Sequence, residues 1–224
     1  MYGEVVESLK EHELFEIAVL QWLKNRRFLD PLVFGGGTLL RLCHELPRYS
    51  MDLDFWFYRK INYAGYFAKL AESLREDYKL TDAADKRFTL VFEIQPAAGR
   101  QRLKIEIRKE VAPPQTTEEK IAFSPVGSIQ ILLRGFTLLH MAQNKVNAFL
   151  DRGEIRDVFD LEFLLRKGIH PDLKPDTVKS LLSRLQKLKK HDYDVKLGSL
   201  LMPELRDYYR VHGFSFLTER YTSG

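Results

Sequence analysis

A short acidic motif is the part of the sequence best suited to chemistry. Asp52 and Asp54 are separated by one residue, and on a β-strand residues two apart point to the same face. Two like charges side by side on a strand repel each other. A bound divalent cation removes that conflict, and Mg²⁺ favours few carboxylates together with waters and phosphate oxygens. The spacing therefore indicates a magnesium site, although an isolated Asp-x-Asp is also common on protein surfaces.

A run of glycines precedes the acidic pair. Gly35, Gly36 and Gly37 lead into Thr38, where a helix is expected to start. Backbone N–H groups at a helix start are unpaired, and the helix dipole favours an anion there. Thr38 adds a hydroxyl that either donates to a phosphate or caps the helix. The run predicts a phosphate cradle in Gly36, Gly37 and Thr38, and a tight turn with positive φ is the alternative.

A third carboxylate on a neighbouring strand would complete a two-metal site. Residues 102–111 alternate between apolar and polar side chains, and Glu106 lies on the polar face of that predicted strand. Glu93 holds the same place on the preceding strand and is the weaker candidate. Two cations held by Asp52, Asp54 and Glu106 would activate an attacking hydroxyl and stabilise a leaving oxygen.

The second half of the chain offers a lysine and two further aspartates. Lys145 falls beside the apolar stripe of a predicted helix over 136–150, so its ammonium group can project inward toward triphosphate oxygens. A surface lysine with a packed stem is the alternative. Asp157 and Asp160 lie one turn apart near the start of a predicted helix, where acids also suit the helix dipole.

Arginines and a serine complete the candidate set. Arg41, Ser50 and Arg156 are assigned to phosphate or nucleotide binding. The arginines have a second interpretation, because they could instead pair with acidic neighbours, as could Arg48 and Arg152. Ser50 could instead bond the backbone near the entrance of its strand.

The elements that position these residues have an α+β pattern. Strands are expected early and helices late, and the break at Pro113-Pro114 divides residues 1–114, a mixed α/β core, from residues 115–224, a mostly helical part. Strands are predicted over 32–34, 52–58, 86–95, 102–111 and 126–132. Helices are predicted over 4–25, 38–46, 62–79, 136–150, 154–167, 176–190 and 203–211.

Composition narrows the class of protein further. Hydrophobic residues make up 45% of the 224 residues, and the net charge is +4, which permits a polyanionic partner without demanding one. The single cysteine, Cys43, excludes a disulfide framework within the chain and a cysteine-based zinc cage. The acidic N-terminus is unlike a signal peptide, and no apolar run is long enough to span a bilayer. We therefore expect a soluble, cytoplasmic protein that uses oxygen-bound Mg²⁺.

Two motifs in order resemble those of a known family. The first reads Gly36-Gly37-Thr38-x-Leu40-Arg41 and continues as Arg48-x-Ser50-x-Asp52-Leu53-Asp54-Phe55. The second reads Lys145-x-x-Ala148-x-x-x-Arg152-x-x-x-Arg156-Asp157-x-x-Asp160-Leu161. Together with the strand around Glu106 they look like the AbiEii/AbiGii toxin family of nucleotidyltransferase-like proteins. The wider superfamily commonly has Gly-Ser where this chain has Gly37-Thr38.

The resemblance carries expectations about fold and function. It implies a DNA polymerase β-type nucleotidyltransferase core, a mixed β-sheet flanked by helices, followed by a helical part that adds Lys145 and Asp157 to the site. It also implies an NTP substrate, Mg²⁺, an RNA acceptor such as a tRNA 3′ end, and a toxin role opposed by an antitoxin encoded nearby. A protein hydroxyl as acceptor, and a nucleotide-binding module without turnover, are the alternatives.

Overall fold

The computed structural model describes residues 2–99 and 101–222, with side chains described from residue 6. The chain forms two compact units. Residues Met1–Glu45 and Tyr49–Phe136 form the first, here called the sheet unit. Residues Leu46–Arg48 and Thr137–Gly224 form the second, here called the helical unit.

The sheet unit is built on one seven-stranded mixed sheet, with strand order β3-β4-β5-β2-β1-β7-β6. Its central pairs are antiparallel for β1 with β2, and parallel for β2 with β5 and for β1 with β7. The outer pairs are antiparallel. The strands are β1 (Leu32–Gly35), β2 (Asp52–Phe57), β3 (Lys79–Asp85), β4 (Thr89–Gln95), β5 (Leu103–Val111), β6 (Thr117–Phe123) and β7 (Gln130–Phe136).

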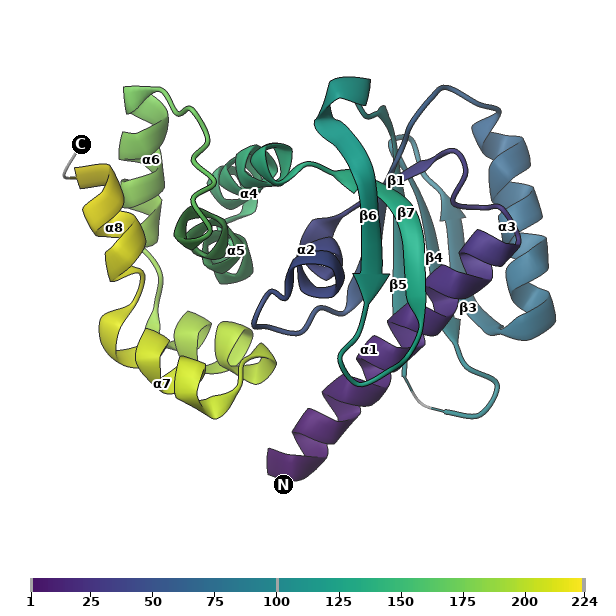
Figure 1. Cartoon of the computed structure of the whole chain (residues 1–224), viewed down its shortest axis with the longest axis horizontal. Helices are drawn as coiled ribbons and strands as arrows, with labels where there is room; N and C mark the ends of the chain where they lie inside the picture. The colour runs from purple at the N-terminus through teal and green to yellow at the C-terminus, as the bar shows by residue number, and fades with distance from the viewer. Residues whose placement is uncertain (1, 100, 223–224) are drawn as a thin grey trace. The chain divides into compact units, whose positions relative to one another are not determined.

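Three helices cover this sheet (Figure 1). Helix α1 (Tyr2–Asn25) contacts β5 and β7, α2 (Gly36–His44) contacts β1, β2 and β6, and α3 (Tyr63–Asp77) contacts β3 and β4. The short 3-10 turn η1 (Pro114–Thr116) links β5 to β6.

Strand β2 alternates strictly, and this decides where its acids lie. Leu53, Phe55 and Phe57 are buried at 0–1% exposure, and burial of each such side chain contributes about 1.5–3 kcal/mol. Asp52 and Asp54 therefore lie on the opposite face of the strand, as the sequence predicted.

The helical unit begins with a helical hairpin. Helix α4 (Leu138–Arg152) starts at Thr137, whose hydroxyl accepts from the N–H of His140, and it ends at Gly153 with φ 72°. Helix α5 (Ile155–Arg166) follows directly. The remaining elements are α6 (Pro175–Leu185), the π-helix η2 (Asp192–Leu197), the 3-10 turn η3 (Gly198–Leu200), α7 (Pro203–His212) and α8 (Ser215–Thr222).

The α+β class is confirmed, but the division of the chain differs from the one expected at residue 114. Strand β7 pairs with β1, and β6 pairs with β7 along its whole length, so residues 117–136 complete the sheet. The prolines at 113 and 114 only introduce the turn η1. Residues Leu46–Arg48 join the helical unit, where Arg48 forms a β-bridge with Leu201.

Two further differences have physical causes. The helix predicted over 62–79 ends at Asp77, and Lys79–Asp85, most of which was given no element, forms the edge strand β3 by backbone pairing with β4. The strand predicted over 86–95 begins only at Thr89, and Phe88 before it is 70% exposed.

Candidate active site

The acidic face of β2 continues onto β5. In the parallel pairing, Asp54 is the register partner of Glu106, and Asp52 is the partner of Lys104. Asp54 and Glu106 therefore lie side by side on the face opposite the buried Leu53 and Ile105. The strand register therefore places the carboxylate of Glu106 on the strand adjacent to Asp54, as the sequence predicted.

The glycine run meets the acidic face at Gly36. This residue has φ +70°, and a Cβ built on it would collide with Oδ2 and Cβ of Asp54. Only glycine tolerates both the backbone conformation and the close approach. The start of α2 thus lies directly against the Asp54 carboxylate, and the tight-turn interpretation is confirmed for this residue. The phosphate cradle stays a prediction.

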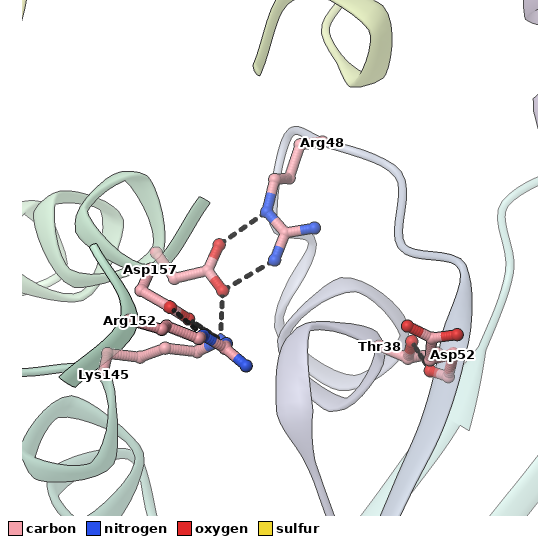
Figure 2. A network of polar contacts seen from close by, with 7 residues as sticks. Thr38, Arg48, Asp52, Lys145, Arg152 and Asp157 are labelled. Atoms are coloured by element: carbon pink, nitrogen blue, oxygen red, sulfur yellow. Dashed lines mark hydrogen bonds and ion pairs between the residues drawn. The ribbon is translucent and has the colours of Figure 1, made fainter. Parts of the chain in front are cut away.

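Thr38 has a different position from the one expected of a helix cap. The N-cap of α2 is Gly35, and its side chain makes no capping bond. The Thr38 side chain is fully buried, and its hydroxyl donates to the backbone carbonyl of Asp52 at 2.5 Å (Figure 2). The capping prediction is therefore wrong, because this hydroxyl ties α2 to the first residue of β2.

Glu106 makes ion pairs with two cations of its own strand. Nζ of Lys104 lies 2.6 Å from Oε2 of Glu106, and Nη2 of Arg108 lies 4.0 Å from Oε1. The hydrogen bond that Lys104 donates to Glu106 raises the pKa of Lys104. The weaker candidate, Glu93, lies on β4. It accepts a bond from Thr81 at 2.9 Å and pairs with Arg102 at 3.3 Å.

The donor set of the acidic face fits a hard cation. Asp52 and Asp54 supply carboxylate oxygens, and Mg²⁺ commonly uses one or two carboxylates together with substrate phosphates. Because Gly36 has no side chain, the Asp54 carboxylate can occupy the space beside it. No group of three His, Cys, Asp or Glu side chains is already arranged as a metal site among the described residues. Lys104 holds Oε2 of Glu106, so a role for Glu106 as third ligand would use Oε1.

Behind this face lies a set of buried acids on α1 that the sequence interpretation missed. Glu16 is fully buried, and Oε1 lies 3.5 Å from the Thr38 hydroxyl. Burial, followed by the charges of Glu13 and Asp52, raises the pKa of Glu16 well above its ordinary value of 4.5. In the sequence of α1, polar residues interrupt the apolar positions that face the sheet. This pattern was the signal that could have revealed the buried acids.

Arg41 and His12 lie in the same buried region as these acids. Nε of Arg41 lies 2.6 Å from Oε2 of Glu13, whose other oxygen accepts a bond from Ser124 at 2.5 Å. The guanidinium of Arg41 also lies 4.7 Å from the ring centre of Tyr49. Nε2 of His12 lies 3.2 Å from the backbone carbonyl of Met51. Arg41 is therefore part of the packing around the acidic face, and a phosphate role for it stays a prediction.

The helical unit contains a second, mixed charge cluster (Figure 2). The side chain of Lys145 is 8% exposed, and Nζ lies 2.6 Å from Asp160 and 3.3 Å from Asp157. The inward projection predicted for Lys145 is confirmed. Its neighbours are the two aspartates of α5 that the sequence placed one turn apart.

Each aspartate of the cluster also binds an arginine through two bonds. Arg48 donates to Asp160 from Nε at 2.6 Å and from Nη2 at 2.7 Å. Arg152 donates to Asp157 from Nε at 2.7 Å and from Nη2 at 2.8 Å. Burial alone would raise the pKa of Asp160, but Arg48 and Lys145 outweigh it and lower that pKa. The pairing interpretation of Arg48 and Arg152 is confirmed.

The remaining candidates are less constrained. Ser50 and Arg156 are half-buried, immediately before β2 and within the first turn of α5, and their nucleotide-binding roles stay predictions. Burial raises the pKa of the Cys43 thiol to about 12, so this residue is a packed side chain and a poor nucleophile.

Comparison with known proteins identifies the class. The fold is that of nucleotidyltransferase-like proteins, and the family model described as "Nucleotidyl transferase AbiEii toxin, Type IV TA system" matches residues 18–211. The chain belongs to the AbiEii family and is a nucleotidyltransferase. Comparison with curated proteins gives no match.

Solved structures agree with this assignment. JHP933 from Helicobacter pylori is 25% identical with a TM-score of 0.56, over 97% of this chain and 94% of that chain. MenT4, a nucleotidyltransferase toxin from Mycobacterium tuberculosis H37Rv, is 18% identical with a TM-score of 0.52, over 95% and 89% of the chains. An antigenic nucleotidyltransferase-like protein from Paracoccidioides brasiliensis is 14% identical with a TM-score of 0.50, over 89% and 97%. The two less identical structures show the fold alone.

The helices were also compared with the length of a membrane span. Among the residues that the structure describes, no helix combines the length and apolar character needed to cross a bilayer.

Proposed function

We propose that the chain transfers a nucleoside monophosphate from an NTP to an acceptor hydroxyl at an RNA 3′ end, with tRNA as the expected acceptor. The observation that supports this most is the acidic face, in which Asp52, Asp54 and Glu106 share one side of paired strands beside a glycine turn. The acceptor hydroxyl attacks the α-phosphorus in line, the bond from that phosphorus to the β-phosphate oxygen breaks, and pyrophosphate leaves.

Magnesium, held by Asp52 and Asp54 with Glu106 as third ligand, would supply positive charge at the reacting phosphate oxygens. Gly36 and Gly37 offer backbone N–H groups to the β- and γ-phosphates at the start of α2. Positioning and charge neutralisation contribute most of the rate in phosphoryl transfer.

The helical unit is proposed to act on the same substrates through Lys145 and Asp157. Lys145 neutralises charge on the triphosphate, for which a compact ammonium group is suited. Asp157 orients Lys145 or assists loss of the proton from the acceptor hydroxyl. Arg156 and Ser50 are proposed to bind phosphate, as is Arg41.

A labelling experiment tests the transfer. The full chain is incubated with each labelled NTP, Mg²⁺ and total RNA or lysate protein, beside an Asp52→Asn/Asp54→Asn variant and the exposed control Asp172→Asn. We expect label on RNA from the wild type and the control, and a loss of at least about 10²–10³-fold in the double variant. Unchanged melting of the double variant separates lost chemistry from lost folding.

Other outcomes identify the alternatives. Label on protein supports protein nucleotidylation, which the modest net charge of +4 favours more than a strongly basic chain would. NTP binding without transfer supports a regulatory module. Transfer that survives in the double variant would falsify the assignment of Asp52 and Asp54.

The toxin role and its partner are proposed from the family. A type IV toxin–antitoxin system pairs this enzyme with an antitoxin, expected to be encoded nearby. Induced expression should arrest growth, and co-expression of the neighbouring small gene should restore it. Arrest that persists in the Asp52→Asn/Asp54→Asn variant would show that toxicity does not come from transfer.

A further inference from the structure

A basic cleft lies within the helical unit, at the C-terminal ends of α4 and α6 and beside the π-helix η2. Its volume is about 790 Å³. Among its lining side chains are the cations Arg152, Arg184, Lys187 and Lys196 and the single acid Asp192, which pairs with Lys196 at 3.0 Å. A cleft with this excess of positive charge attracts anions and raises their local concentration.

Arg184 forms a fixed part of the cleft. Its Nη1 donates to the carbonyl of Leu150 at 2.6 Å, and its Nη2 donates to the carbonyl of Asp151 at 3.0 Å. These carbonyls belong to the last turn of α4, where the helix dipole is negative. Gly153 permits the approach, because a Cβ there would come within 3.0 Å of the guanidinium. Arg184 thus offsets the negative helix end that would otherwise repel an anion.

The wall formed by α6 has donors at regular spacing. Ser180, Ser183 and Arg184 of α6 line the cleft, and residues separated by three and four positions share one helical face. The Ser180 hydroxyl donates to the carbonyl of Asp176 at 2.8 Å, and Lys187 lines the cleft from the turn after α6 ends at Leu185. Ser180, Ser183 and Lys187 are exposed. A row that mixes hydroxyl and cationic donors suits successive phosphates of a nucleic-acid backbone, which proteins bind with these side chains.

Arg152 connects this cleft to the cluster around Lys145. It lines the cleft, and its guanidinium also donates two bonds to Asp157. An anion in the cleft therefore lies beside the aspartate that is proposed to assist the acceptor hydroxyl.

We propose that this cleft binds the phosphate backbone of the acceptor RNA. The inference rests on the proposed function for the choice of RNA. It assigns a phosphodiester subsite to Ser183, Lys187 and Lys196, with Arg184 as a positioning residue. Free nucleotide offers similar phosphate chemistry, so the experiment has to distinguish the two sources.

The test uses the full chain and RNA binding measured by fluorescence anisotropy over a salt series. Lys187→Ala and Lys187→Glu remove or reverse one exposed charge of the cleft. Lys179→Ala and Lys179→Glu are matched controls, because Lys179 is an exposed lysine of α6, the helix that precedes Lys187, and lies outside the lining. We expect Lys187→Ala to weaken binding roughly threefold to tenfold for all RNA sequences and to reduce the salt slope by about one. The controls should bind as the wild type does.

Each result decides the assignment. Unchanged affinity and salt slope in both Lys187 variants would overturn it, as would undetectable RNA binding by the wild type. Displacement of RNA by equimolar ATP, with ATP binding weakened by Lys187→Ala, would assign the cleft to free nucleotide instead. The labelling experiment stays separate: RNA labelling lost only in the Asp52→Asn/Asp54→Asn variant, with no effect at Lys187, leaves the proposed function standing and refutes the cleft.

Discussion

Two carboxylic acids, one in each unit, are fully buried, yet their pKa values are shifted in opposite directions. Glu16 of the sheet unit has the acids Glu13 and Asp52 as charged neighbours, and its pKa is raised. Asp160 of the helical unit lies between Arg48 and Lys145, and its pKa is lowered. Burial alone raises the pKa of both, so the sign of the nearest charges decides the direction in which each pKa moves.

The two units therefore favour added ligands of opposite charge. The acids on and behind β2 are only partly compensated by Arg41 and Lys104, so this region favours an added cation. In the helical unit, Arg48, Lys145 and Arg152 outnumber Asp157 and Asp160, so this region favours an added anion. The proposed magnesium–nucleotide substrate and nucleic-acid acceptor would supply both charges.

The largest expected effect is on the stability of the helical unit. Asp160→Ala leaves Arg48 and Lys145 buried without their shared partner, and we expect a loss of about 3–5 kcal/mol in the free energy of unfolding. Urea unfolding of the full chain measures it, with the exposed Asp172→Ala as control, expected within about 0.5 kcal/mol of the wild type. A loss below 1 kcal/mol for Asp160→Ala would show that the two cations find other partners.

A smaller effect is expected where the sheet unit admits no side chain. Gly36→Ala imposes φ +70° on alanine, at a cost of about 1–2 kcal/mol, and its Cβ collides with Asp54. Gly168→Ala is a matched control, because Gly168 has φ +80° with nothing within 4 Å. Both variants should lose stability, whereas only Gly36→Ala should lose transfer activity. Equal activity in the two variants would show that the glycine turn does not support the catalytic role proposed for Asp54.

The third prediction concerns the dependence of stability on pH that Glu16 causes. The folded pKa of Glu16 is above its ordinary 4.5, so its contribution to stability is complete below that pH and is lost as the pH rises through the folded value. Glu16→Gln does not titrate, and we expect it to be more stable than the wild type at pH 8, with the difference shrinking toward pH 4. Thermal unfolding between pH 4 and 8 measures this, with the exposed Glu72→Gln as control. A difference that does not depend on pH would contradict it.

Asp160 should show the mirror-image dependence on pH. Its folded pKa is below the ordinary 3.8, so its contribution is complete above that pH and is lost as the pH falls through the folded value. The stability advantage of the wild type over Asp160→Asn should therefore shrink in acid and stay constant between pH 6 and 8. An advantage that persists in strong acid would mean that shape rather than charge determines it.

Much of the site could be predicted because strand periodicity is a local property. Alternation along β2 and β5 put Asp52, Asp54 and Glu106 on polar faces, and helical spacing directed Lys145 inward. The failures had non-local causes. Thr38 was misassigned because its partner, the carbonyl of Asp52, comes from another element. The edge strand β3 has no apolar pattern, so only its pairing with β4 reveals it.

The sequence by itself determined the chemistry: oxygen donors two residues apart, a glycine turn, and a lysine with two aspartates at helical spacing. The tertiary structure alone decided which charges face each other, because burial and pairing join residues far apart in the chain. Arg48 and Asp160 are separated by 112 positions, yet they form two bonds. It also decided that residues 117–136 complete the sheet, since β7 finds its partner in β1. Local spacing fixes the face on which a side chain lies, whereas its electrostatic neighbours are known only after distant segments have packed.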